Sequence, residues 1–321
     1  MLNIFKTVGD RLVAIENLGE KGSWISLAAP SEIELSGVCD HAKVSPDLLR
    51  YPLDEEEISR IEFDEGQALI IIKIPVIRGN TYDTIPLGMI MTEELFITVS
   101  LEKNELLDEF ASGKLKTFNT NKKTRFLLQI LFRTATLYLK YLRQIDKKTD
   151  EVERRLHQSM RNEELIKLLD LQKSLVYFTT SLKSNEIVME KLLKSRLSKE
   201  PLDPDASNSR LIKMYEEDED LLEDVITENK QAIEMGEIYT SILSGTMDAF
   251  ASVISNNLNI VMKFLTSVTI VLSIPTIIAS LYGMNVPLPF QDSPHAFAGT
   301  LAVSASLAAL IVMVFVKRRM F

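Results

Sequence analysis

Five hydroxyl side chains recur along an otherwise apolar stretch towards the C-terminal end of the sequence. They are Thr266, Thr269, Ser273, Thr276 and Ser280. On a helix that turns 100° per residue, all five fall within an arc of about 80° and form one line. Hydroxyls are common where membrane helices pack together, and they also suit the wall of a water-filled pore. The sequence leaves both interpretations open.

The same helix face continues in the N-terminal direction with an amide and two bulky apolar side chains, Asn259, Met262 and Leu265. A pore would require several copies, since a chain with two membrane spans cannot enclose one alone. Around a symmetry axis, Met262 and Leu265 would become stacked apolar rings, which can close a pore by excluding water. Pro275 frees the carbonyl of Val271, which predicts either a simple kink or a site for hydroxyls or water.

The parts of the chain that must position this line differ in charge. Residues 1–263 carry 44 of the 45 acidic and 33 of the 36 basic residues, a net charge of −11. From 264 to 316 the only formal charge is Asp292. The apolar segments 264–281 and 296–316 each approach the ~20 residues that cross a bilayer. The sequence therefore predicts an acidic soluble body followed by a transmembrane hairpin.

Basic residues flank the two spans on one side of the membrane only. Lys263 precedes the first span and a basic tail, 317–321, follows the second, whereas the loop 282–295 contains neither lysine nor arginine. The positive-inside rule then places both termini in the cytoplasm of a multi-pass protein of the cell (inner) membrane. The single cysteine, Cys39, cannot form an intramolecular disulfide, which agrees with a cytosolic body. The acidity of that body argues against nucleic acid as a partner.

The soluble body divides at its prolines and glycines. Runs such as WISL, ALIIIKI and ELFITV predict strands, and Ser31 with Glu34 has the spacing of a capping box before a helix, so residues 1–115 are expected to form an α/β domain. Ser45 before Pro46 predicts a second helix start. No glycine or proline occurs from 115 to 200, which predicts a long antiparallel helix pair over 116–205 that turns near Arg161.

Beyond Pro201 and Pro204, proline is absent until Pro275. We expect one stalk helix over 206–281 that begins near Ser207 and is on the order of 100 Å long. The predicted fold class is an α+β N-terminal domain, long helices and a two-helix transmembrane hairpin, with the second span at 296–316.

Enzyme chemistry finds no support in the sequence. His41, His157 and His295 are far apart and have no metal-ligand spacing with Cys39. Gly113 and Lys114 do not form a phosphate loop, because leucine follows them. We therefore expect neither an enzyme nor an organic cofactor, and transport driven by the membrane potential rather than by ATP.

Directly after the first span stands Tyr282-Gly283-Met284-Asn285. In this position the motif resembles the signature of the CorA family of magnesium channels. The stretch 259–266 and the later Pro275-Thr276-x-Ile278-Ala279 also resemble that family's pore helix. The resemblance covers the architecture of the whole chain and implies a homopentameric funnel, with Gly283, Met284 and Asn285 as its selectivity filter.

The chemistry of magnesium gives a reason for such a filter. Mg²⁺ loses water reluctantly, so a ring of Asn285 amides with nearby Gly283 carbonyls can recognise the hydrated ion without stripping it. Gly283 would allow a sharp exit from the helix, and the alternative role of Asn285 is a helix C-cap. The loop then departs from the family pattern, because Asp292 is its one acid.

Seven of the ten residues from Tyr215 to Asp224 are acidic, which is also typical of a solvated helix face. By its position relative to the pore helix, Asp224 resembles the family's stalk aspartate, which shares a regulatory cytosolic magnesium ion with an acid of the adjacent subunit. Glu223 and Asp220 are further candidate ligands. The candidate partner acids are Asp54, Glu55, Glu56 and Glu57.

The expected function is passive, potential-driven uptake of hydrated magnesium, with cobalt or nickel as further ions, through a channel closed by cytosolic magnesium. A zinc or other divalent cation transporter of the ZntB-like branch is the alternative within transport. A membrane-anchored helical sensor or scaffold without a pore is the alternative from another class. The expected partners are other copies of the chain, the lipid bilayer and divalent cations.

Overall fold

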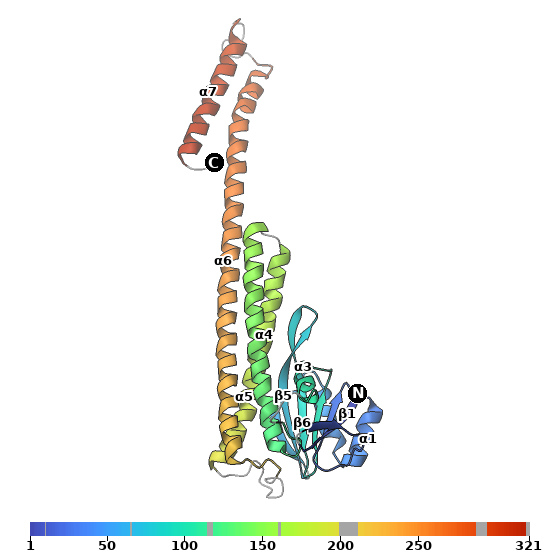
Figure 1. The fold of residues 1–321 in the computed structure, drawn as a ribbon. Coiled ribbons are helices and arrows are strands. Elements are labelled where there is room, and N and C mark those ends of the chain that lie inside the picture. The colour runs from blue at the N-terminus through green and yellow to red at the C-terminus, as the bar shows by residue number, and fades with distance from the viewer. Residues whose placement is uncertain are drawn as a thin grey trace. The chain divides into compact units, whose positions relative to one another are not determined.

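The computed structural model describes residues 1–9, 11–64, 66–113, 118–159, 162–198, 211–286 and 294–318, without the side chains of 157–159 and 196–198. The turn expected at Arg161, the break at Pro201 and Pro204, the loop acid Asp292 and the tail beyond Arg318 lie outside these ranges. The chain divides into two compact units, Met1–Ser244 and Gly245–Phe321 (Figure 1).

The first unit is built on a seven-stranded sheet in the order β2-β1-β3-β7-β6-β5-β4. Only β3 and β7 pair in parallel, and every other neighbouring pair is antiparallel. The strands predicted from the three apolar runs are confirmed as β3, β5 and β7. The strands are β1 (Leu2–Val8), β2 (Arg11–Ala14), β3 (Ser23–Ala28), β4 (Arg60–Asp64), β5 (Gln67–Arg78), β6 (Thr81–Met91) and β7 (Phe96–Ser100).

Short helices cover one face of this sheet. They are α1 (Glu32–Ala42), α2 (Pro46–Arg50) and the single turn η1 (Tyr51–Leu53), and Leu35 and Leu48 join Ile25 and Ile97 in a buried core. The capping box of Ser31 is confirmed, with the Glu34 N–H donating to its hydroxyl. The helix start at Pro46 is also confirmed, although the side chain of Ser45 makes no capping hydrogen bond.

Two long helices cover the opposite face. Neighbouring strand residues point to opposite sides of a sheet, so each strand also has side chains on this face that the helices can bury. They are α4 (Lys123–Ser159) and α5 (Asn162–Ser198), which run antiparallel (Figure 1), and the short α3 (Glu105–Ala111) precedes them. Trp24, next to Ile25 in β3, packs its ring 5.2 Å from Phe126 of α4. The indole N–H of Trp24 donates to the Thr98 hydroxyl at 2.9 Å.

The buried side-chain amide of Asn185, in α5, forms hydrogen bonds with the middle of β5. At this point β5 has already extended past the residues that pair with β4. The Oδ1 atom of Asn185 accepts the Lys73 backbone N–H at 2.8 Å, and its Nδ2 donates to the Lys73 carbonyl at 2.8 Å. The Ser59 hydroxyl donates to the same Oδ1. Asn185 thus replaces the hydrogen bonds that a longer β4 would have made.

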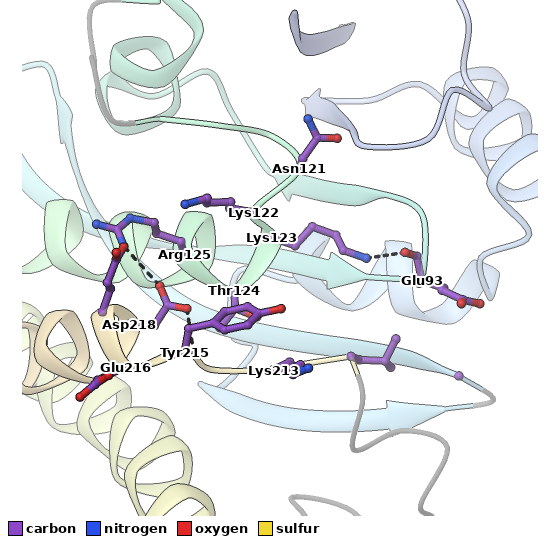
Figure 2. Close-up of a pocket in the computed structure, with 13 residues that line it drawn as sticks. Glu93, Asn121, Lys122, Lys123, Thr124, Arg125, Lys213, Tyr215, Glu216 and Asp218 are labelled. Carbon is purple, nitrogen blue, oxygen red and sulfur yellow. Dashed lines mark hydrogen bonds and ion pairs between the residues drawn. The ribbon is translucent and has the colours of Figure 1, made fainter. Parts of the chain in front are cut away.

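The helix α6 (Glu216–Tyr282) begins later than the expected start near Ser207, since residues 211–215 are not helical. Asp218 fixes the start by accepting the Tyr215 N–H at 3.1 Å, and Arg125 of α4 holds Asp218 and Glu217 (Figure 2). Further along α6, a Cβ at Gly236 would lie 2.7 Å from the hydroxyl oxygen of Thr179 in α5. The absence of a side chain therefore permits this close contact between two helices.

Candidate ion-conduction site

The second unit contains the C-terminal part of α6 and the helix α7 (Ala296–Lys317), and both are long and apolar enough to cross a membrane. Ser267 of α6 and Ser304 of α7 are buried between them, at 0% and 8% exposure. Along the N-terminal part of α7, the less exposed positions are small side chains at every fourth position, which permits close packing there. They are Ala296, Thr300, Ser304 and Ala308, and the larger Ile311 and Phe315 are the next partly buried positions.

The hydroxyl line of α6 lies on another face of the helix. Ser267 is about 100° from Thr266, and four members of the line remain exposed in the single chain. Those four are Thr266, Thr269, Thr276 and Ser280, and Ser273 is partly exposed. Packing of α6 against α7 within one chain therefore does not account for this line.

Three of these hydroxyls donate back to their own helix. Thr269 donates to the Leu265 carbonyl at 2.8 Å, Ser273 to Thr269 at 2.7 Å and Thr276 to Leu272 at 3.0 Å. A hydroxyl has one hydrogen and two lone pairs, so each bonded oxygen retains acceptor capacity only. The water molecules around a cation point their hydrogens outwards, and this face can accept them.

On the N-terminal side of the line, Asn259, Met262 and Leu265 are all exposed in the single chain. The three- and four-residue spacing that joins them to the hydroxyls continues further back through Ser255 and Ser252 to Asp248. Sequence reasoning stopped at Asn259 and missed this carboxylate. The same helical arithmetic would have found it, because Asp248 lies within about 20° of Asn259 around the helix.

The predicted filter residues follow the end of α6. The Gly283 N–H donates to the Ala279 carbonyl at 2.9 Å and the Met284 N–H to Leu281 at 3.3 Å, so these two residues rather than Asn285 make the terminal bonds of the helix. Gly283 does not adopt the left-handed backbone conformation. Its requirement is space, since a Cβ would lie 3.2 Å from the Ala279 oxygen. Met284 and Asn285 are exposed.

The predicted regulatory acids lie in the first unit. Asp220, Glu223 and Asp224 are exposed on α6. Within the described ranges of one chain, no three Asp, Glu, His or Cys side chains come together as a group that could hold a metal ion. A regulatory ion at Asp224 would therefore need a ligand from a second copy.

The four candidate partner acids are partly occupied within their own chain. Glu55 forms an ion pair with Arg78 at 2.6 Å, and Glu57 pairs with Arg60. Asp54 accepts the backbone N–H of Glu56 at 3.0 Å. The pKa of the neighbouring Lys73 is lowered by its burial, an effect that these acids oppose. Asp54 and Glu56 thus have more capacity for an ion than Glu55 and Glu57.

The family described as "CorA-like Mg2+ transporter protein" matches residues 19–319. The chain belongs to the CorA family. It is 30% identical over 303 residues to the cobalt/magnesium transport protein CorA of Methanocaldococcus jannaschii, covering 91% of this chain and 88% of that protein. Proteins of the CorA family are ion transporters or channels and not enzymes, and this chain is a CorA-type divalent cation transporter.

The CorA fold extends over the whole chain. The complete structure of the CorA magnesium transporter from Methanocaldococcus jannaschii matches with a TM-score of 0.80 and 26% identity, covering 98% of this chain and 97% of that one. The cytoplasmic domain of ZntB from Vibrio parahaemolyticus matches with a TM-score of 0.56 and 13% identity over 79% of this chain and 96% of that one. The second likeness shows a shared fold alone.

Proposed function

We propose that the protein is a homo-oligomeric channel for passive uptake of hydrated Mg²⁺, closed by cytosolic Mg²⁺. The observation that carries this proposal is the hydroxyl line of α6, in which Thr269, Ser273 and Thr276 retain acceptor capacity only. The line faces away from α7 and leads to Gly283-Met284-Asn285. A helix that served only as an anchor would need neither feature. Magnesium keeps its inner water shell more firmly than other common cations, and an acceptor-lined path suits such an ion.

Assembly into several copies is supported by a second line on α6. Ile254, Leu258, Val261 and Leu272 recur at spacings of three, four or eleven residues and are exposed by 36–64% in one chain. This apolar line is centred about 70° from the hydroxyl line, so neighbouring copies can pack through it while the hydroxyls face a common axis. Five copies is the number that the family resemblance implies.

The positive-inside pattern at Lys263, Lys317 and Arg318 supports cytoplasmic termini. An inward flow of a doubly charged ion then gains about 4.6 kcal/mol per 100 mV, from ~2.3 kcal/mol for each charge. That free energy is sufficient for accumulation without ATP. Met262 and Leu265, both more than half exposed in the single chain, are the proposed apolar rings that close the path.

Purified protein in liposomes tests the proposal. The liposomes contain a magnesium-sensitive dye and have an inside-negative membrane potential. We expect Mg²⁺ to enter, and we expect Asn285→Ala to abolish this entry. The matched control, Asn80→Ala at the tip of the β5–β6 hairpin, should retain it. Zinc entry that depends on a proton gradient, without potential-driven magnesium entry, would instead establish the ZntB-like alternative. If correctly assembled protein shows no flux of any ion, the protein would instead be a membrane-anchored sensor or scaffold without a pore.

A further inference from the structure

One end of the second unit carries positive charge without a matching negative charge. Lys263 precedes the membrane-spanning part of α6, Lys317 is the last residue of α7, and Arg318 follows it. In the described ranges 249–286 and 294–318 these three side chains carry the only formal charges, so no carboxylate lies among them. We propose that Lys263 and Arg318 together bind the phosphate of an anionic phospholipid of the bilayer.

Lys263 lies on the side of α6 that faces α7. The buried or partly buried positions on this side fall within an arc of about 60° and are Ser267, Val271, Ile274 and Ile278. Lys263 comes about one turn before Ser267 and lies about 40° from it around the helix. Its side chain nevertheless remains exposed, so a ligand can reach it.

Arg318 lies correspondingly on the side of α7 that faces α6. Its backbone N–H donates to the Val314 carbonyl at 3.0 Å, so the chain still follows the helix at this residue. Arg318 is about 40° from the buried Ser304 around that helix, and it is exposed. Lys317, in contrast, is about 140° from Ser304 and lies on another side of α7.

The hairpin thus has one cation on each of its two facing sides and at the same end, because α7 runs back alongside α6 (Figure 1). Like charges repel, and water weakens this repulsion less at the low-dielectric edge of a membrane. No ion pair joins Lys263 or Arg318 to a carboxylate in the part of the chain that the structure describes. Asp248, the acid that precedes Lys263 along α6, is about 22 Å away along the helix axis. An anion from outside the chain would therefore offset the repulsion.

The position of Lys263 around α6 indicates where this anion comes from. Lys263 is about 100° from the centre of the hydroxyl line and nearly opposite the apolar line of Ile254, Leu258, Val261 and Leu272. In the assembly proposed above, this side of the hairpin faces neither the common axis nor a neighbouring copy. It faces the bilayer, which favours a phospholipid over a soluble anion.

The two side chains suit a lipid phosphate. A guanidinium group can form two parallel hydrogen bonds with a phosphate, and an ammonium group adds a compact positive charge. Basic groups between membrane helices on the cytoplasmic side bind anionic head groups in this way. In the orientation proposed above, this end of the hairpin meets that leaflet. A zwitterionic phospholipid should bind more weakly, because its own ammonium group offsets the charge of its phosphate.

Native mass spectrometry of the delipidated full-length protein in detergent tests the proposal, with phosphatidylglycerol, phosphatidylcholine or inorganic phosphate added. We expect phosphatidylglycerol to bind more tightly than phosphatidylcholine, and inorganic phosphate to bind more weakly than either. Lys263→Gln and Arg318→Gln should each weaken the binding of phosphatidylglycerol at least about fivefold, the effect of one basic residue next to an anionic lipid. Arg318→Lys keeps the charge and should retain most of the binding, which separates loss of charge from loss of folding.

The matched control is Lys317→Gln, which removes one positive charge from the neighbouring residue on another side of α7. It should leave the binding of phosphatidylglycerol nearly unchanged. Equal weakening by Lys317→Gln and Arg318→Gln would overturn the proposal, because binding would then be a general effect of charge. Equal affinity for phosphatidylcholine or for inorganic phosphate would also overturn it. Binding is measured without ion flux, so a failure here would not bear on the proposed channel.

Discussion

Each hydroxyl of α6 that donates to a carbonyl of its own helix has used its only hydrogen, and it offers a passing ion nothing but oxygen lone pairs. Sequence spacing was sufficient to predict that these residues share one face. It could not predict the direction of their hydrogen bonds, because a threonine rotates between the carbonyl three or four residues back and its surroundings. The chemical character of the face therefore emerges only from the structure.

Asp248 extends this face with a full negative charge. We predict that Asp248→Asn lowers the initial rate of Mg²⁺ entry at subsaturating magnesium about tenfold, the lower end of the effect by which a charged ring concentrates counter-ions. Dye-loaded liposomes give this rate. Glu228→Gln is the matched control, since Glu228 belongs to the same helix but lies on the opposite side. An unchanged rate in Asp248→Asn would remove Asp248 from the ion path.

Asp146 of α4 provides a prediction about pH. Burial, followed by the nearby charge of Asp150, raises the pKa of Asp146, while its hydrogen bond with Tyr239 of α6 opposes that rise. A raised carboxyl pKa means that folding favours the protonated form, so its contribution to stability is present at low pH and is lost as pH rises through the folded-state pKa. We expect Asp146→Asn to gain stability relative to the wild type between acidic and neutral pH.

Chemical denaturation of the two proteins at a series of pH values measures this difference. The asparagine retains an acceptor for the Tyr239 hydroxyl, so the comparison isolates the charge. A constant difference across the series would show that Asp146 has an ordinary pKa.

At the scale of elements, the strands and the long helices were predictable because each carries its own local signal of apolar runs or uninterrupted helical spacing. The contacts between them were not. Asn185 has no distinguishing feature in the sequence, yet it completes the hydrogen bonding of β5 from a helix more than 100 residues away. The predicted start of α6, near Ser207, was also wrong. The ion pair between Arg125 and Asp218 at the actual start joins residues that the entire helix pair separates along the chain, so no local signal reveals it.

Two glycines of α6 give a matched test of helix packing. Gly236→Ala would place a methyl group against Thr179, whereas nothing lies within 4 Å of a Cβ at Gly245. Alanine raises helix propensity by about 1 kcal/mol at either position, but overpacking costs about 1–3 kcal/mol. We expect Gly245→Ala to be neutral or stabilising. The free energy of unfolding of Gly236→Ala should be lower than that of Gly245→Ala by roughly 1–3 kcal/mol.

Denaturation of the full-length variants in detergent measures the two free energies of unfolding. If the alanines have equal effects, α6 does not depend on a close approach to α5 at Gly236.

At the scale of the whole molecule, the acids of α6 and the hydroxyl line belong to one helix but to different compact units. Among the described residues of one chain, Asp220, Glu223 and Asp224 belong to no group of three side chains that could hold a metal ion. A magnesium ion that bridges two copies would therefore stabilise the assembly rather than the subunit. This relation could be predicted from the sequence only through the family resemblance, because spacing along one chain contains no information about a second.

Removal of magnesium tests this relation. Saturating Mg²⁺, at about 100 times its dissociation constant, should stabilise the wild-type assembly by about 2.7 kcal/mol relative to EDTA. Asp224→Lys should lose this gain and also the dependence of flux on internal magnesium, whereas Asp40→Lys on α1 should keep both. Thermal unfolding with and without EDTA provides the measurement. Full retention of the magnesium effect in Asp224→Lys would place the regulatory ion elsewhere.

The order of the two units along the chain also governs how the protein is made. Residues 1–244 leave the ribosome first, and residues 245–286 require a further roughly 2–8 s at ~5–20 residues per second. Domains generally fold as units during synthesis, with the N-terminal one first. We therefore expect the sheet and its helices to be already folded when the first span is synthesised. A body folded in the cytosol no longer threads through a translocation channel, so biosynthesis itself would retain it on the cytosolic side.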